Sequence, residues 1–140
     1  MFKKIFVILI ALIPLTSFAK WTYMAKNDSA TDDQPFSIYM DLKAIRKDGN
    51  LVKVWVLNDH AEREAGDLSY MSMILHQEYD CTDKKVRTLS WALYTGPMGE
   101  GEAILSSPVP APDAILEPWE YITSGTIEEV ILDRACLIKH

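Results

Sequence analysis

The chain has 140 residues, a formal net charge of −6, 49% hydrophobic residues and 24% charged residues. This length suits one domain with a modest core. The acidic balance argues against general binding to nucleic acid or to anionic membranes, because both need a large positive footprint.

The first 19 residues predict a cleaved secretory signal peptide. Two lysines precede an apolar run over residues 5–15, and Ser17 and Ala19 fit the −3 and −1 positions of signal peptidase. The run is about half of the ~20 residues that a spanning helix needs, so an uncleaved anchor is the weaker interpretation. No cysteine follows the run, as a lipobox would require. We expect residues 20–140 to form one exported domain without a transmembrane segment, in the periplasm or at the outer-membrane surface.

Alternating apolar residues and turn signals predict an antiparallel sheet. Strands are expected over residues 21–24, 36–40, 51–57, 68–81, 85–94, 102–106 and 119–122. Asp41 should cap a single helical turn, and Asp48-Gly49-Asn50 should form a tight turn. Residues 58–67 are polar and are expected to form an exposed connection, and two further loops are expected at 95–101 and 107–118.

The two longest strands should each have two distinct faces. In the strand over residues 68–81, one face should carry Met71, Met73, Leu75, Tyr79 and Cys81, and the other Tyr70, Ser72, Ile74, His76 and Glu78. In the strand over residues 85–94, one face should carry Leu89, Trp91 and Leu93, and the other Val86, Thr88, Ser90 and Ala92. Cys81 therefore belongs to the more apolar side, where a strand enters a hairpin.

A helix is expected over residues 124–136. Thr126 and Glu129 have the spacing of a capping box. The helix has apolar residues at Ile127, Val130, Ile131, Leu132 and Cys136. Helical patterns do not alternate with strands, so the fold class is α+β: a single antiparallel sheet of about five to six strands with a C-terminal helix packed on it.

Cys81 and Cys136 are the only cysteines, and both lie in the part predicted to be exported. An oxidising compartment favours a disulfide between them, and a helix docked on the sheet would bring them together. Closing about 55 positions of chain would stabilise the fold by about 4 kcal/mol in the chain-entropy model. A metal site is the alternative, but two cysteines without a nearby His or second pair make a poor ligand set.

Three basic residues gather beside Cys81 at the predicted hairpin tip: Lys84, Lys85 and Arg87. Lysines at a turn are ordinarily solvated, and they also discourage edge-to-edge aggregation. The alternative is a cationic contact for an acidic segment of a protein partner. Aromatic residues such as Trp21, Tyr23 or Trp119 form a second candidate binding surface, although most of the four tryptophans are expected in the core.

No residue pattern indicates catalysis, a cofactor or a metal. His60, His76 and His140 are isolated, and Ser106-Ser107 lacks a nucleophile elbow. Gly99 and Gly101 lack the dinucleotide fingerprint, and the acidic residues Glu62, Glu64 and Asp67 are expected to be solvated. We expect a protein that is not an enzyme.

Four segments in this order resemble the surface-adhesin protein E family of Gram-negative bacteria: "VKVWVLND", "SYMSMILHQEYDC", "YTGPMGEG" and "WEYITSGTIEEVILDRAC". The resemblance implies an antiparallel sheet with a carboxy-terminal helix, a disulfide matching Cys81 to Cys136, and a homodimer. It also implies adhesion to host cells and to host matrix or plasma proteins. The alternative function is that of a soluble periplasmic accessory or structural protein of the cell envelope, with no adhesive role.

Overall fold

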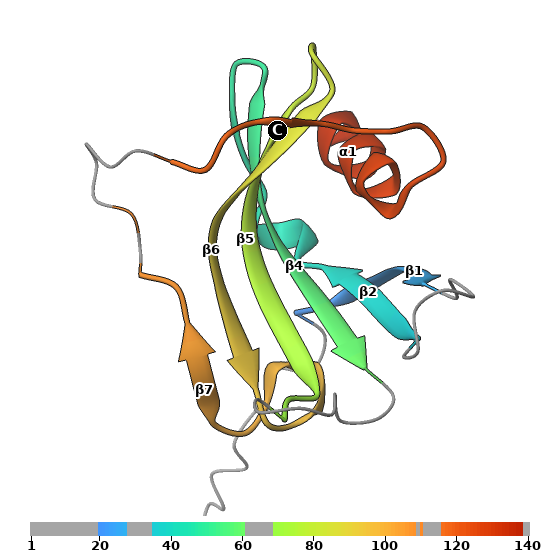
Figure 1. The fold of residues 1–140 in the computed structure, drawn as a ribbon. Coiled ribbons are helices and arrows are strands. Elements are labelled where there is room, and N and C mark those ends of the chain that lie inside the picture. The colour runs from blue at the N-terminus through green and yellow to red at the C-terminus, as the bar shows by residue number, and fades with distance from the viewer. Residues whose placement is uncertain (1–19, 28–34, 61–68, 109, 111–115, 139–140) are drawn as a thin grey trace, which may run out of the picture.

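The computed structural model describes residues 20–27, 35–60, 69–108, 110 and 116–138, and Figure 1 shows their arrangement. The predicted signal peptide, His140 and the acidic residues of 62–67 lie outside these ranges. The strands are β1 (Thr22–Asn27), β2 (Phe36–Met40), β3 (Arg46–Asp48), β4 (Leu51–His60), β5 (Ser72–Asp80), β6 (Lys85–Tyr94), β7 (Ala103–Ser106) and β8 (Glu120–Tyr121). The helices are the single-turn η1 (Leu42–Ala44) and η2 (Pro97–Gly99) and the α-helix α1 (Ile127–Leu137).

The strands form one antiparallel sheet in the order β1-β2-β4-β5-β6-β7, with the short β3 beside β4 and the short β8 beside β6. The predicted α+β class with a C-terminal helix on a single sheet is confirmed. Six strands lie on the main path, and β3 and β8 are two short additions. Within the described ranges, no helix is long and apolar enough to cross a membrane.

The core lies between α1 and one face of the sheet, called here the helix face. Val52, Val54 and Val56 alternate along β4 and are at most 2% exposed. Ile131 and Leu132 of α1 pack into the same buried cluster. Figure 1 shows that α1 covers only the end of the sheet near the β5–β6 turn.

Strand β4 continues further than the sequence predicts. Asn58, Asp59 and His60 were expected in an exposed connection, but they belong to β4 and His60 is only 6% exposed. Pairing with β2 explains the difference, since Phe36 lies opposite His60 and their rings are 5.1 Å apart. Polar residues can belong to a strand here because the neighbouring strand forms hydrogen bonds with their backbone N–H and C=O groups.

A β-bulge in β6 makes the predicted faces of that strand wrong. His76 pairs with Ser90, but Gln77 pairs with Thr88, so Leu89 is an extra residue. Val86 and Thr88 consequently share the helix face with Trp91 and Leu93, instead of lying opposite them. Alternation cannot reveal a bulge, because the bulge adds one residue to an otherwise regular pattern.

The other face of the sheet, called here the far face, is covered at one end by the loop that contains η2. The Ser72 hydroxyl donates to Gly96 O at 2.7 Å and accepts from Gly99 N at 2.9 Å. Met98 N donates to Asp59 Oδ1 at 2.7 Å. Ser72 is fully buried although it lies on the face predicted to be more polar. The expected turn is present, and its docking onto the sheet is what buries Ser72.

The predicted capping box of α1 does not form. Thr126 is the N-cap but its side chain makes no capping hydrogen bond, because its hydroxyl donates to Thr123 O at 2.6 Å. The Glu129 carboxylate accepts weakly from Gly125 N, at 3.4 Å, instead of reaching Thr126 N. Val130, expected on the apolar side, is 42% exposed.

Candidate partner-binding site

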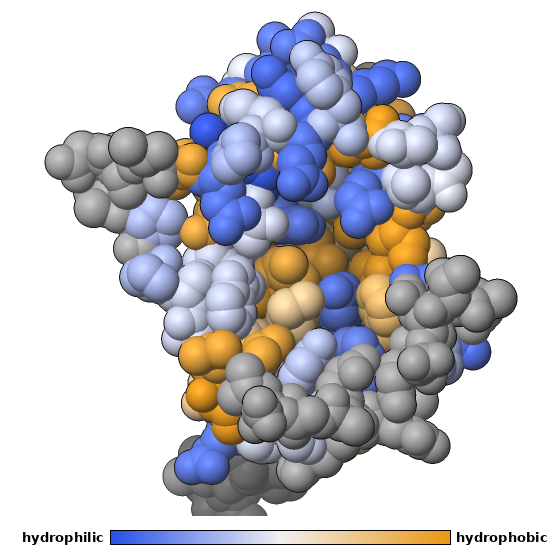
Figure 2. Space-filling view, in the orientation of Figure 1, coloured by the Kyte–Doolittle hydropathy of each residue, from blue (hydrophilic) through white to orange (hydrophobic). Residues whose placement is uncertain are grey.

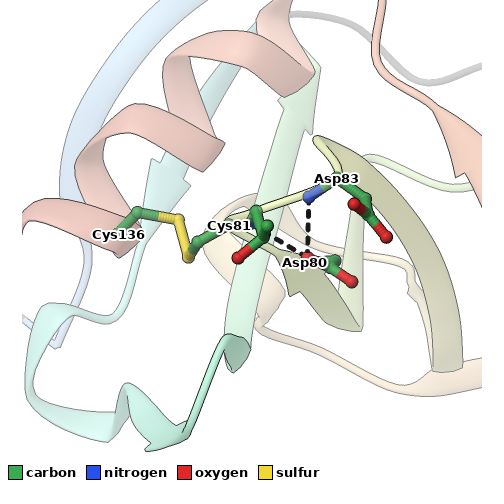
Figure 3. The surroundings of a disulfide bond; sticks show 5 residues. Asp80, Cys81, Asp83 and Cys136 are labelled. Atoms are coloured by element: carbon green, nitrogen blue, oxygen red, sulfur yellow. Dashed lines mark hydrogen bonds between the residues drawn. A yellow bond between two sulfur atoms is a disulfide. The ribbon is translucent and has the colours of Figure 1, made fainter.

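The hairpin tip between β5 and β6 is fixed by a disulfide. Cys81 and Cys136 are bonded, with Cα atoms 5.9 Å apart, which confirms the predicted pairing (Figure 3). Both cysteines are in the disulfide, so neither has a free thiol that could bind a metal. Cys81 N also donates to Asn50 O at 2.9 Å, which ties the tip to the neighbouring β3–β4 hairpin.

The turn itself is held by Asp80. Its Oδ1 atom accepts hydrogen bonds from Thr82 N and Asp83 N, both at 2.9 Å (Figure 3). Lys84 N donates to Asp80 O at 2.9 Å, and Lys84 has a φ of 51°. A left-handed conformation is uncommon for a residue with a side chain and persists here because the turn imposes it. The Lys84 side chain is exposed.

The three predicted basic residues lie close together but have different surroundings. Lys84 forms no ion pair with a described residue, whereas Lys85 Nζ is 3.5 Å from Asp83 Oδ2. Arg87 donates through Nε, at 2.9 Å, and through Nη2, at 2.5 Å, to the same oxygen of Glu78. Glu78 is only 5% exposed although it was predicted on the more polar face. Arg87 therefore compensates a buried carboxylate, and Lys84 is the cation most available to a partner.

An aromatic residue distant in sequence completes this surface. The indole of Trp119 has Lys85 Nζ at 5.2 Å and the Arg87 guanidinium at 4.2 Å from its ring centre. Tyr121 pairs with Lys85 across β8 and β6 and is 80% exposed. Lys84, Lys85, Arg87, Trp119 and Tyr121 are called the tip cluster below. The sequence places Trp119 and Tyr121 in a strand, but nothing in it pairs that strand with the hairpin tip.

The other predicted aromatic residues do not join Trp119. Trp21 and Tyr23 lie at or before β1, at the opposite edge of the sheet from β6 and β8. Tyr23 is 55% exposed and meets Tyr39 edge-on, and Lys20 lies over the Trp21 ring. The expectation that most tryptophans are core residues is wrong: none of the four is fully buried.

A groove of about 500 Å³ opens on the helix face between the start of α1 and the sheet. Its apolar walls include Phe36, Ile38, Val56, Leu75 and Ile127. Figure 2 shows this hollow as an apolar area beside the helix. The Tyr79 hydroxyl at its base donates to Gln77 Oε1 at 3.0 Å, and burial, helped by the Glu128 charge, raises the pKa of Tyr79. Tyr79 therefore stays neutral and acts as a structural donor.

On the far face, the indole of Trp55 and the imidazole of His76 are stacked, with centres 4.1 Å apart and planes at 6°. Burial lowers the pKa of His76, and the nearby Lys53 charge lowers it further, while Glu78 opposes both. In the described part of the chain, no group of three or more His, Cys, Asp or Glu residues is placed to hold a metal. The described residues therefore form surfaces that another molecule can contact.

Comparison with known proteins gives a consistent assignment. The family model described as surface-adhesin protein E matches residues 21–137. None of the curated protein sequences matches the chain. The solved structure of Haemophilus influenzae protein E is similar to this one, with a TM-score of 0.54 and 14% identity over 84% of each chain. At that identity the structural likeness shows the shared fold.

The family match covers nearly all of the described chain and includes the disulfide, the η2 loop and α1. The family is one of surface adhesins, which implies an exported, adhesin-like binding protein. The chain belongs to the surface-adhesin protein E family.

Proposed function

We propose that this protein is a non-enzymatic adhesin at the bacterial surface, and that its tip cluster binds an acidic segment of a host matrix or plasma protein. The observation that carries the proposal is the 80% exposed Tyr121 beside Lys85 at a disulfide-braced turn. Tyrosine, tryptophan and arginine are the residues most often found at the energetic centre of protein interfaces. A rigid turn also lowers the entropic cost of binding.

The charge pattern narrows the contact to Lys84, Lys85 and the two aromatic rings. Arg87 is held by Glu78, so it contributes mainly by positioning the Trp119 ring. Lys84 forms no ion pair with a described residue, and Lys85 is paired with the exposed Asp83. An acidic segment can displace such an exposed pair at little cost, because surface ion pairs are weak.

The test measures binding to immobilised matrix and plasma proteins. Lys84→Gln and Tyr121→Ala should each weaken binding, and the effect of Lys84→Gln should shrink as salt rises. Lys43→Gln is the matched control, because Lys43 is exposed on η1 and its loss changes the net charge equally. Equal binding by wild type, Lys84→Gln and Tyr121→Ala would refute the tip cluster as the contact.

Surface display has its own test, because adhesion by intact cells requires it. Cells producing the protein with a carboxy-terminal tag are treated with external protease beside a periplasmic control protein. Loss of the tag while the control survives supports the adhesin. Protection until the outer membrane is opened contradicts it and favours a periplasmic accessory protein.

We also propose the homodimer that the family resemblance implies. The strands β1 and β7 end the main path of the sheet, and each pairs with one described strand. Tyr23 on β1 and Leu105 on β7 are 55% and 41% exposed. Edge strands with exposed apolar residues are ready to pair with a second copy. Sedimentation equilibrium would test this, and a monomer at all concentrations would refute it.

A further inference from the structure

A second set of cations lies on the far face, where Glu78 separates it from Arg87 of the tip cluster. Strand register places Lys53 of β4 between Arg46 of β3 and Glu78 of β5. Alternate residues of a strand share a face, so Trp55 lies on the same side as Lys53. Val52 and Val54 lie opposite, buried under α1. Lys53 and Trp55 are therefore neighbours on the face that α1 does not cover.

The two cations carry uncompensated charge. Lys53 and Arg46 are both exposed, and neither forms an ion pair with a described residue. The Nη1 atom of Arg46 donates to Lys43 O and Ile45 O, at 3.3 and 3.0 Å, so the guanidinium is held in place while its charge stays free. The nearest acidic neighbour, Glu78, is engaged by Arg87. This positive site occurs in a chain whose net charge is −6.

An ordered aromatic pair lies beside these cations. Trp55 and His76 are stacked and only partly buried, so their orientation is set before any ligand arrives. The lowered pKa of His76 keeps the imidazole neutral at pH 7, so it offers hydrogen bonding and an apolar ring surface. Its next cross-strand neighbour is Ser90, which has a small polar side chain.

We propose that Arg46, Lys53, Trp55 and His76, called the far-face cluster, bind a linear sulfated glycan. Sulfate groups are acceptors for Arg and Lys, and the apolar side of a pyranose ring packs on aromatic surface. Arg46 and Lys53 lie opposite one another on adjacent strands, whose backbones are about 5 Å apart, so the two side chains can reach neighbouring anionic groups of such a chain. This site goes beyond the protein contact proposed above and uses none of its residues.

A glycan is favoured over other polyanions for two reasons. This choice rests on the proposed function, because an adhesin at the bacterial surface meets extracellular glycans, whereas the net charge of −6 opposes general binding to nucleic acid. An acidic protein segment would need only the cations, and would leave the stacked ring pair without a role. The ring pair and the cations together match a ligand that alternates sugar rings with anionic groups.

The test is binding of the full-length exported protein to an immobilised heparin hexasaccharide at low and physiological salt. Lys53→Gln should weaken binding about fivefold, and Trp55→Leu about tenfold. Lys47→Gln is the matched control, because Lys47 is exposed on β3 and adjacent to Arg46 but points to the opposite face. It should change binding by less than twofold, and thermal unfolding of each variant should confirm that it is folded.

Three results would overturn the proposal. The first is no heparin binding by wild type at low salt. The second is equal weakening by Lys47→Gln and Lys53→Gln, which would show only a general charge effect. The third is equal affinity for single-stranded DNA or fully desulfated heparin. Lys84→Gln should leave heparin binding unchanged, so failure of the tip cluster and failure of the far-face cluster can be told apart.

Discussion

Arg87 donates two hydrogen bonds to a single oxygen of Glu78, whose side chain is only 7% exposed. A buried carboxylate needs a partner, since an unpaired charge away from water is costly. The basic character of position 87 therefore has a structural cause in the neighbouring strand. Of the three basic residues at the tip, the two lysines are the better candidates for binding.

The first prediction concerns this pair. Arg87→Gln should lower the free energy of unfolding by about 3 kcal/mol, because the buried Glu78 loses the cation that donates hydrogen bonds to it. Glu78→Gln should cost less, since Arg87 is more exposed and can reach water. Urea denaturation of both single variants and the double variant measures the coupling. If the effects of the two substitutions on the free energy of unfolding were additive, Arg87 and Glu78 would not stabilise the fold as a pair.

The second prediction concerns the disulfide. Replacing Cys81 and Cys136 by serine should lower the free energy of unfolding by about 4 kcal/mol, because the bond closes 55 positions of chain. The wild-type protein unfolded under reducing conditions is the control and should match the double variant. A cost below about 1 kcal/mol would show that the unfolded chain is already constrained in some other way.

The third prediction compares two glycines with similar backbone conformation. Gly49 and Gly101 have φ values of 59° and 82°, so alanine is strained at both. Gly49 has open space around it, but a Cβ at Gly101 would meet the Thr95 hydroxyl oxygen and lie 3.0 Å from Gly96 N. Gly49→Ala should cost about 1 kcal/mol, and Gly101→Ala distinctly more. Equal costs, measured by urea denaturation, would show that the loop around η2 adapts freely.

The fourth prediction concerns pH. Burial, and then the Lys53 charge, lowers the pKa of His76 below its usual 6.5. The unfolded chain therefore binds this proton first, so the contribution of His76 to stability is complete above about pH 6.5 and is lost as the pH falls toward the lower pKa of the folded state. NMR titration of the imidazole should give a midpoint below 6.5.

A matched variant separates the causes of that shift. Lys53→Gln should raise the midpoint of His76 toward 6.5, while Lys47→Gln on the opposite face should leave it unchanged. His76→Phe should also reduce the loss of thermal stability between pH 7.5 and 5. A wild-type midpoint at or above 6.5 would contradict the placement of His76 in its stack.

Local patterns in the sequence were sufficient for most of the fold. Alternating apolar residues in 51–57 and 85–94 predicted β4 and β6, and Asp41 does cap η1, accepting from Lys43 N at 3.2 Å. The pairing of Cys81 with Cys136 followed from the compartment and from a helix docked on a sheet. These features depend on neighbours in sequence or on a single long-range contact, so composition and spacing can reveal them.

The candidate sites depended on contacts that no local pattern encodes. The sequence grouped Lys84, Lys85 and Arg87, but only the tertiary structure buried Glu78 beneath Arg87 and brought Trp119 over its guanidinium. The stack of Trp55 on His76 requires the register of β4 against β5, and the faces of β6 required its bulge. Composition and spacing reveal which side chains are available and where strands turn. Strand register and docking decided which charges are compensated, because the environment of a side chain is set by residues far away along the chain.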